Sequence, residues 1–533
     1  MRTALFSILA LTTSVAFAAA QNEDCRPAVT AAIQDSQASR DPALAKRATQ
    51  LANQCLQLPL AWSAASRWRS LDPLNVDAIT AQAALAFQLH KVTEGRALFK
   101  SLATADIDSD QMLADLLPLA GEQGTAVAAW NMLKGNIDPA KLSPGTRNAL
   151  TELAWNSANF AAARAIVDVS LAQKGDDATA LQWLARLEAA ADHPAAALAA
   201  AHRSAAAGPV EHALAVGETL LDLDRVEEAH REFERLLENP EVREPAERQL
   251  ALMALAGGDF EDAKRRFAAR LSRAENPGEA VLYMAAIAER QGETDAALSL
   301  YQRLAEAGAG ILPRARAASL LLAAGKRAAA DKLLLEWHAA HPEQSVEVLN
   351  TQSELLADAG QFGEAIKVTD AALLRYPGHP TLAYQRAMLL ERAGRTREAL
   401  RDFTALLAVR AEDPGVMNGL GYTLADHNRE VPRAEKLIRD ALALTPDNPA
   451  IIDSLGWVLY RRGHVNEAAE LLARAYHLSR DAEIAAHWGE VLWAKGAKGE
   501  ARTVWARALA RDPDSKALQA VLQKLVPDSH RKP

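Results

Sequence analysis

Three consecutive stretches of about 34 residues carry one pattern that decides the fold. They read PGVMNGLGYTLADHNREVPRAEKLIRDALALTP (414–446), DNPAIIDSLGWVLYRRGHVNEAAELLARAYHLSR (447–480) and DAEIAAHWGEVLWAKGAKGEARTVWARALARDP (481–513). Each holds an apolar–glycine pair (Leu420-Gly421, Leu455-Gly456, Trp488-Gly489) and, 12 or 13 positions later, an alanine (Ala434, Ala468, Ala501). Glycine lets a second helix approach closely, and the closing Pro446 and Pro513 end a helix, with Arg480 in the equivalent place. The pattern predicts a repeated pair of packed helices.

The same period extends upstream through most of the chain. Small residues that mark a second helix recur every 33 to 35 positions, at Gly95, Ala128, Ala163, Ala196, Ala229, Ala263, Ala297, Ala330, Ala365, Ala399, Ala434, Ala468 and Ala501. Upstream of Ala229, runs such as 195–197 allow the register to slip by one. A unit of this length is typical of the tetratricopeptide helix–turn–helix repeat. We therefore expect an all-α fold, a tetratricopeptide-repeat α-solenoid forming a right-handed superhelix of about 13 helical hairpins, in which each hairpin contacts only its neighbours.

The N-terminus has the pattern of a secretory signal peptide over residues 1–20. Arg2 supplies a positive charge, residues 4–11 an apolar core, and residues 16–20 a small-residue cleavage site. The alternative is a short first helix of the solenoid. Cys25 follows Asn-Glu-Asp rather than small residues, so no lipoprotein signal is found, and no later stretch is long and apolar enough for a transmembrane segment. These features predict a periplasmic protein.

The remaining chain divides into three parts. We expect an N-terminal helical cap at 21–75, the repeat array at 76–512, and a C-terminal capping helix with its tail at 513–533. The cap is atypical because 50 residues separate Ala45 from Gly95 and the stretch from 58 to 74 fits no repeat. Terminal units of a repeat array generally differ from the rest.

Cys25 and Cys55 are the two cysteines of the chain. Cys25 opens the first helical pattern and Cys55 closes the second, so an antiparallel hairpin brings them together. In an oxidising compartment this arrangement favours a disulfide. The alternative is a pair of free buried thiols. No histidine lies nearby at a metal-ligand spacing.

Charge and motifs argue against several classes of function. The net charge of −9 disfavours nucleic acid and anionic membranes as partners. The segment 323–327 lacks the first glycine and the hydroxyl residue of a phosphate loop. His487 with Glu490 is at most half a metal site, and a triad of Asp453, Ser454 and His487 fails because Ser454 lies mid-helix. We expect no enzyme activity, no cofactor and no metal.

The informative surface is the inner face of the first helix of each hairpin. At three- to four-residue steps, the last four repeats place there Tyr384, Asn418, Tyr422, Asp426, Asp453, Trp457, Tyr460, Arg461, Glu490 and Trp493. Large aromatics beside charged and amide groups suit binding of an extended peptide or a partner helix. The alternative is that Trp457 and Trp493 fill gaps between adjacent first helices.

Three segments match more than the generic repeat: NGLGYTLAD (418–426), PDNPAIIDSLGWVLYR (446–461) and EIAAHWGEVLW (483–493). They resemble a proteobacterial family of exported tetratricopeptide proteins, the LbcA-like adaptors of a periplasmic carboxyl-terminal processing protease. The resemblance covers roughly 414–512, and it implies a protein that binds the protease and delivers peptidoglycan hydrolases to it. The described adaptor is an outer-membrane lipoprotein, whereas this chain lacks the lipid-modified cysteine signal.

The sequence thus predicts a non-catalytic periplasmic adaptor or scaffold that binds proteins through its repeats. One alternative is a scaffold for export and assembly of an envelope polysaccharide or a pilus. A second alternative is a hydrolase whose site lies in the irregular regions 58–75 or 110–145.

Overall fold

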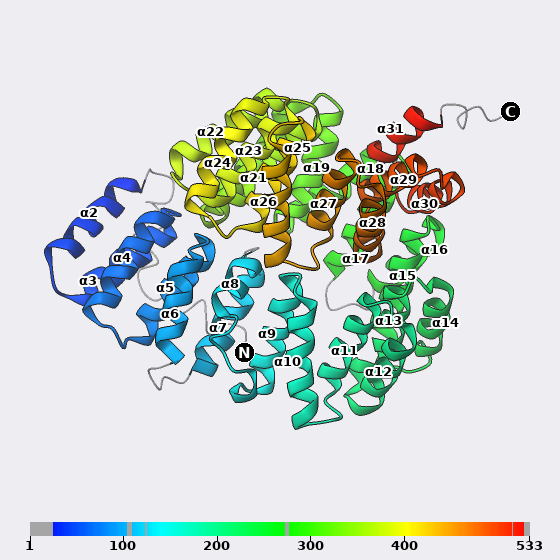
Figure 1. Cartoon of the computed structure of the whole chain (residues 1–533), viewed down its shortest axis with the longest axis horizontal. Coiled ribbons are helices and arrows are strands. Elements are labelled where there is room, and N and C mark those ends of the chain that lie inside the picture. The colour runs from blue at the N-terminus through cyan, green and yellow to red at the C-terminus, as the bar shows by residue number, and fades with distance from the viewer. Residues whose placement is uncertain (1–24, 104–108, 123–124, 272–276, 514, 527–533) are drawn as a thin grey trace. The chain divides into compact units, whose positions relative to one another are not determined.

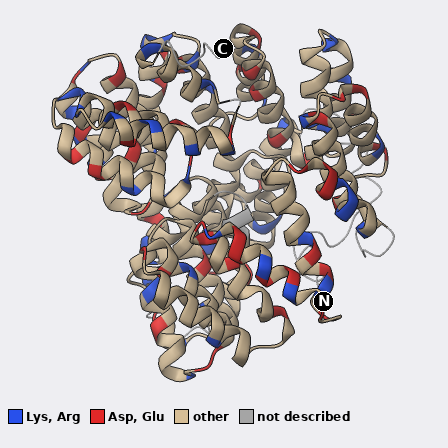
Figure 2. Cartoon of the chain, turned by 90° about the vertical axis from the view of Figure 1, so that its right-hand side faces the viewer, with Lys and Arg blue, Asp and Glu red and all other residues tan. Residues whose placement is uncertain are grey.

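A computed structural model describes residues 25–103, 109–122, 125–271, 277–513 and 515–526 (Figure 1). These residues form 30 α-helices and three short 3-10 helices, with no strand among them, which confirms the all-α prediction. None of the described helices is both long and apolar enough to cross a membrane. The predicted signal peptide (1–20) and the tail after 526 lie outside the described residues. Figure 2 shows acidic and basic residues interspersed over the helices.

The predicted N-terminal cap contains three helices, α2 (Arg26–Ala38), α3 (Pro42–Gln54) and α4 (Leu58–Leu71). Helix α4 accounts for the long gap between Ala45 and Gly95, because it adds one helix between the first hairpin and the regular array. Pro59 stands in the first turn of α4, where a missing N–H costs nothing.

The array alternates first and second helices thirteen times. The first helices are α5 (Val76–Gln88), α7 (Ser109–Glu122), α9 (Pro144–Asn156), α11 (Ala178–Ala190), α13 (Ala215–Asp222), α15 (Arg243–Ala256), α17 (Pro277–Arg290), α19 (Ile311–Ala323), α21 (Ser345–Asp358), α23 (Pro380–Arg392), α25 (Pro414–Asp426), α27 (Pro449–Arg461) and α29 (Ala482–Ala494). The second helices are α6 (Val92–Ala103), α8 (Ala126–Leu133), α10 (Phe160–Gln173), α12 (Pro194–Ala207), α14 (Val226–Leu236), α16 (Phe260–Leu271), α18 (Thr294–Glu306), α20 (Arg327–Ala340), α22 (Phe362–Arg375), α24 (Thr396–Val409), α26 (Val431–Leu444), α28 (Val465–Ser479) and α30 (Lys498–Arg511). The 3-10 helices are η2 (Pro139–Lys141), η3 (Val210–Leu214) and η4 (Pro342–Gln344), and α31 (Lys516–Leu525) ends the described chain.

All thirteen predicted small residues lie on second helices, and twelve of them are buried. The prediction for Ala196 is wrong by one position, because Ala196 is exposed whereas Ala197 is completely buried. The slip has a simple cause: consecutive alanines after Pro194 are chemically identical, so the sequence does not distinguish the one that faces the partner helix.

The glycines of the C-terminal hairpins are required by close packing, as predicted. A Cβ atom on Gly421 would lie 2.7 Å from Cγ1 of Ile438, and one on Gly456 would lie 2.8 Å from Cγ of Leu472. A Cβ atom on Gly489 would collide with the ring of Trp505. Contacts closer than 3 Å are too short for a packed core, so a side chain at these positions would displace the neighbouring helix.

The helices group into two compact units, each built from two separate stretches of chain. Unit 1 comprises residues 1–149 and 264–406, and unit 2 comprises residues 150–263 and 407–533. In each unit, turns that lie hundreds of residues apart in sequence contact each other. The expectation that each hairpin contacts only its neighbours is therefore wrong.

Unit 2 contains a polar long-range contact, the Asp447 contact, between the α26–α27 turn and the α9–α10 turn. The amide of Asp447 donates to the carbonyl of Ala158 at 3.0 Å, and the amide of Phe160 donates to Oδ2 of Asp447 at 2.9 Å. The side-chain amide of Asn159 donates to the carbonyl of Leu444 at 3.2 Å. Asp447 thereby accepts from an N–H at the start of α10, where the helix dipole favours a negative charge.

Unit 1 contains an apolar long-range contact, the Leu56 contact, between the cap and the end of α22. Leu56 belongs to a hydrophobic cluster with Ala372, Tyr376 and Leu382. Beside it, the side-chain amide of Gln57 donates to the carbonyl of Arg375 at 3.0 Å. Each unit thus joins turns that are far apart in sequence, by polar interactions in unit 2 and mainly by apolar packing in unit 1.

Candidate functional site

Nine of the ten predicted binding residues lie in unit 2, on the first helices α25, α27 and α29. Tyr384 lies on α23 in unit 1, where its ring meets Phe403 edge-on at a centroid distance of 6.0 Å. Each of the three helices α25, α27 and α29 begins with a side-chain cap. Asp413 accepts from the amide of Val416, Asn448 from those of Ala450 and Ile451, and Asp481 from those of Glu483 and Ile484. These caps fix where each helix starts and hence which residues share a face.

Four side chains from α27 and α29 form one group, the His487 cluster: Asp453, Trp457, Tyr460 and His487. Nδ1 of His487 lies 3.0 Å from each carboxylate oxygen of Asp453. The indole of Trp457 stacks on the imidazole of His487 with ring centroids 4.4 Å apart. The ring of Tyr460 lies beside the same indole, with centroids 5.4 Å apart. The structure therefore joins three predicted residues through a histidine of the next repeat.

Electrostatics favour the protonated form of His487. Burial by itself lowers the pKa of His487, but the hydrogen bond and the charge of Asp453, with Glu483 and Glu490 nearby, raise it above its ordinary value of 6.5. The Asp453 side chain is only 10% exposed, so water screens the pair weakly. The cluster thus presents a half-buried aromatic pair over a fixed ion pair.

Glu490 is already engaged by the C-terminal helix. Its Oε1 lies 2.8 Å from Nζ of Lys524 on α31. Burial first, and then the negative charge of Glu490, raise the pKa of Tyr460 above that of an ordinary phenol. Ser515 caps α31 by accepting from the amide of Leu518, so a helix lies within the predicted C-terminal segment 513–533.

Trp493 lies outside the His487 cluster. It is partly buried against Trp505 of its own hairpin, with ring centroids 5.8 Å apart. Lys498 and Arg502 lie over the same ring, at 4.9 and 5.5 Å from its centroid. The ring therefore packs within the last hairpin rather than between adjacent first helices.

The remaining predicted residues surround the cluster. Asn418 and Tyr422 are half-buried on α25, Asp426 ends α25, and Arg461 ends α27 in an exposed position. Two polar atoms, Oδ1 of Asn418 and Nε1 of Trp457, are buried without a hydrogen-bond partner among the described residues. A buried polar atom left unpaired costs about 1–3 kcal/mol, so a bound polypeptide that paired these atoms would gain from doing so.

Neither of the chemical alternatives gains support from the geometry. The hydroxyl of Ser454 donates to the carbonyl of Ala450 on its own helix at 2.9 Å, so it is not directed to His487. Within the described part of the chain, no three His, Cys, Asp or Glu side chains are grouped so as to hold a metal ion. Cys25 and Cys55 are joined as a disulfide in the cap.

His487 and Lys524 contact predicted binding residues, Asp453 and Glu490, but were not themselves predicted as parts of the site. A signal for them existed, since the pairs Asp453–His487 and Glu490–Lys524 are both 34 residues apart, one repeat period. Equivalent positions on adjacent first helices face each other. Pairing complementary side chains at this interval would have found both contacts.

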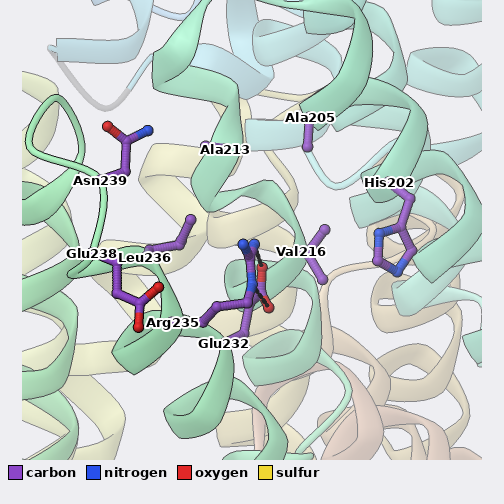
Figure 3. A pocket seen from close by; sticks show the side chains of 9 residues that line it. All are labelled: His202, Ala205, Ala213, Val216, Glu232, Arg235, Leu236, Glu238 and Asn239. Atoms are coloured by element: carbon purple, nitrogen blue, oxygen red, sulfur yellow. Dashed lines mark hydrogen bonds and ion pairs between the residues drawn. The ribbon is translucent and has the colours of Figure 1, made fainter.

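An open pocket of about 630 Å³ in unit 2 is lined by residues of α12, η3, α13 and α14 and of the turn after α14 (Figure 3). Its lining includes His202, Val216, Glu232, Arg235 and Asn239. Two of the charged groups in its wall pair with each other, because Arg235 donates to both oxygens of Glu232 at 2.6 and 3.0 Å. None of the predicted binding residues lines it.

Comparison with known families identifies the repeats. The family model described as tetratricopeptide repeat matches residues 248–310, 350–396, 384–449 and 454–516. These stretches include α25, α29 and residues 454–461 of α27, and so contain Trp457, Tyr460 and His487 of the His487 cluster.

Two curated proteins share part of the sequence. A TPR repeat-containing protein of Pseudomonas aeruginosa is 32% identical over 204 residues, covering 38% of this chain and 35% of that protein. The human protein O-mannosyl-transferase TMTC1 is 27% identical over 199 residues, covering 36% of this chain and 22% of that protein. The chain thus spans about a third or less of each relative's length.

Solved structures of helical repeat proteins are also similar. A thermophilic TPR protein of Thermus thermophilus is 21% identical, with 34% of this chain and 98% of that chain covered and a TM-score of 0.32. The APC/C hetero-tetramer Cut9–Hcn1 is 16% identical, with 93% of this chain and 98% of that chain covered and a TM-score of 0.33. On the family match, this chain is a repeat protein that carries tetratricopeptide repeats in four stretches between residues 248 and 516.

Proposed function

We propose that this protein is a non-catalytic adaptor that holds protein partners on the first-helix surface of its C-terminal repeats. Tetratricopeptide repeats indicate a protein-binding scaffold. The observation that carries the proposal is the His487 cluster, where half-buried Trp457 and Tyr460 stand beside charged groups and an unpaired indole N–H. Aromatic side chains in such settings dominate the energy of protein interfaces.

The proposed setting is the bacterial periplasm. Its support is the signal-peptide pattern of residues 1–20 and the family resemblance of roughly 414–512. In that setting, the proposed partners are a carboxyl-terminal processing protease and the peptidoglycan hydrolases that it degrades. An adaptor that binds both raises their effective concentration for each other, and needs no reactive group of its own.

A pull-down from an envelope extract tests the proposal. The full chain should retain a processing protease together with peptidoglycan hydrolases, and Trp457→Ala with Tyr460→Ala should lose at least one of them. Trp183→Ala is the matched control, because Trp183 is a half-buried tryptophan on a first helix of the same unit, outside the repeats matched by the family model.

The other outcomes are equally informative. Retention of polysaccharide-export or pilus-assembly subunits instead would favour the scaffold alternative. Cleavage of peptidoglycan by the purified chain without partners would contradict a non-catalytic role.

A further inference from the structure

The cap is fastened to α22 by two donors that reach carbonyls at the end of that helix. Nη1 of Arg26 donates to the carbonyl of Leu374 at 3.2 Å, and Nε2 of Gln57 donates to that of Arg375 at 3.0 Å. The last carbonyls of a helix have no partner within the helix, and a positive charge there complements its dipole. Gln57 is buried, and the bond to Arg375 is the shorter of the two that its side-chain amide makes, since the carbonyl of Cys55 lies 3.5 Å away.

The apolar part of the same contact depends on an unusual backbone conformation. Leu56 has φ +54°, in the left-handed region, where it closes α3 in a helix-ending turn. In that turn the amide of Gln57 donates to the carbonyl of Ala52 at 2.9 Å, and the amide of Leu56 donates to that of Asn53 at 3.0 Å. Glycine is the usual residue at this position, so a leucine there is retained only where its surroundings hold it.

The Cys25–Cys55 disulfide joins the start of α2, which carries Arg26, to the end of α3, which is followed by Leu56 and Gln57. Cys25 directly precedes Arg26, and Cys55 directly precedes Leu56 and Gln57. The disulfide between them closes a loop over a sequence separation of 30. It therefore holds the start of α2 against the end of α3. Arg26, Leu56 and Gln57, the three residues that reach α22 and its end, thus lie on one side of the cap.

We infer that the Cys25–Cys55 disulfide is a redox-controlled latch, which fastens the cap to the α22–α23 turn when oxidised and releases it when reduced. In the reduction, a dithiol supplies two electrons and two protons. The Sγ–Sγ bond breaks, the two cysteines become thiols, and the dithiol becomes a disulfide. Both cysteines are only partly buried, so a small dithiol has a route to the bond.

Release follows from the loss of the constraint. Without the bond, the start of α2 is held on the rest of the cap by apolar packing, through Val29 against Ala52 and Leu58. Arg26 lies at the first residue of α2, before Val29, so it loses its fixed position beside Gln57. Leu56 is then free to leave its left-handed conformation, and the apolar cluster around Tyr376 loses a member. The first regular hairpin, formed by α5 and α6, does not take part in the contact and remains folded.

Residue-resolved amide hydrogen exchange on the full chain tests this latch. Dithiothreitol is the probe, and mass spectrometry verifies that both thiols have formed. Amides of residues 372–382 should then exchange roughly tenfold or more faster than in the oxidised protein, while α5 and α6 keep their protection. Cys25→Ala with Cys55→Ala should reproduce this result without a reductant.

Two controls make the experiment decisive. Leu56→Asp keeps the disulfide but breaks the contact, so it should raise exchange at 372–382 in the oxidised state and reduction should add nothing further. The amides of Phe160 and Asp447 in unit 2 should not respond to dithiothreitol.

Several results would overturn the latch. Unchanged exchange at 372–382 with both thiols free would show that the disulfide does not fasten the cap. Loss of protection over all of 26–103 would show that the bond maintains the fold of the cap instead. A further response of Leu56→Asp to reduction, or any response at Phe160 and Asp447, would place the effect elsewhere.

Discussion

The Leu56 contact of unit 1 and the Asp447 contact of unit 2 both join distant parts of the chain, but the first is mainly apolar and the second is polar. Each fastens one helix-ending turn to another, 318 residues away for Gln57 and Arg375 and 287 residues away for Phe160 and Asp447. The Leu56 contact combines apolar burial with a disulfide in the adjoining turn. The Asp447 contact is polar, with Asp447 also paired to Arg474 at 2.7 Å.

The difference teaches how each unit should respond to its surroundings. Apolar burial is insensitive to salt and to small changes in pH, whereas exposed ion pairs are screened by salt. The Leu56 contact should therefore respond to reductants and the Asp447 contact to ionic strength, while His487 makes unit 2 sensitive to pH. The following changes test that division in order of expected effect.

The largest effect should come from Leu56→Asp in unit 1. A carboxylate would be placed in the apolar cluster with Tyr376 and Leu382, and the cap would separate from α22 at a cost of about 2–4 kcal/mol. Chemical denaturation followed by hydrogen exchange at 372–382 measures the loss. Leu74→Asp is the control, because Leu74 is 72% exposed and its replacement should cost under about 0.5 kcal/mol.

Asp447→Ala should produce the next largest effect, confined to unit 2. It removes the acceptor for the amide of Phe160 and the partner of Arg474, which should cost about 1–3 kcal/mol and speed exchange at Phe160. Asp440→Ala removes a mostly exposed i,i+4 pair with Lys436 and should cost about 0.5 kcal/mol or less. Equal losses from the two variants would mean that the Asp447 contact contributes nothing beyond a surface ion pair.

The pH dependence of unit 2 should reflect His487. Because Asp453 raises the pKa of His487 in the folded protein, the protonated form stabilises the fold. That contribution is complete below the ordinary value of 6.5 and disappears as the pH rises through the higher folded value. Over this window the free energy of unfolding should fall as the pH rises. His487→Gln should abolish this slope, and a slope that survives in the variant would assign it to other groups.

The smallest effect should be that of salt on the Arg511–Asp224 pair, which supports the same unit. The guanidinium lies 2.7 Å from both oxygens of Asp224, but the side chains are 37% and 47% exposed. Raising sodium chloride to about 1 M should therefore weaken this pair by less than about 1 kcal/mol, and Arg511→Gln should make the salt response of unit 2 smaller. A larger salt response in the Leu56 contact than in unit 2 would contradict the division between them.

The period of the sequence predicted the helices well because local signals determine them. Gly421, Gly456 and Gly489 mark places where helices touch, and their spacing carries that information within one hairpin. The register failed only at Ala196, where a run of identical residues removes the signal.

The long-range contacts could not be predicted, because no local pattern encodes them. Leu56 looks like an ordinary turn residue in the sequence, and nothing in the stretch around Asp447 points to a partner near residue 160. Within each unit, their partners depend on small rotations between successive repeats, which accumulate over many residues. The His487 cluster is intermediate: its aromatic members follow from helix periodicity, whereas its histidine required comparison of equivalent positions in adjacent repeats.

Paired spin-label distances test most directly whether both long-range contacts exist. One pair replaces Leu60 and Ala371 in unit 1 and the other replaces Ala161 and Ala443 in unit 2, all at exposed positions. Labelling introduced cysteines without reductant keeps the Cys25–Cys55 disulfide intact. Both pairs should give a single short and narrow distance distribution, and reductant-treated samples labelled beforehand should broaden only the first. A long or broad distribution for both pairs in the oxidised protein would show that the repeats form an open array, with neither contact in place.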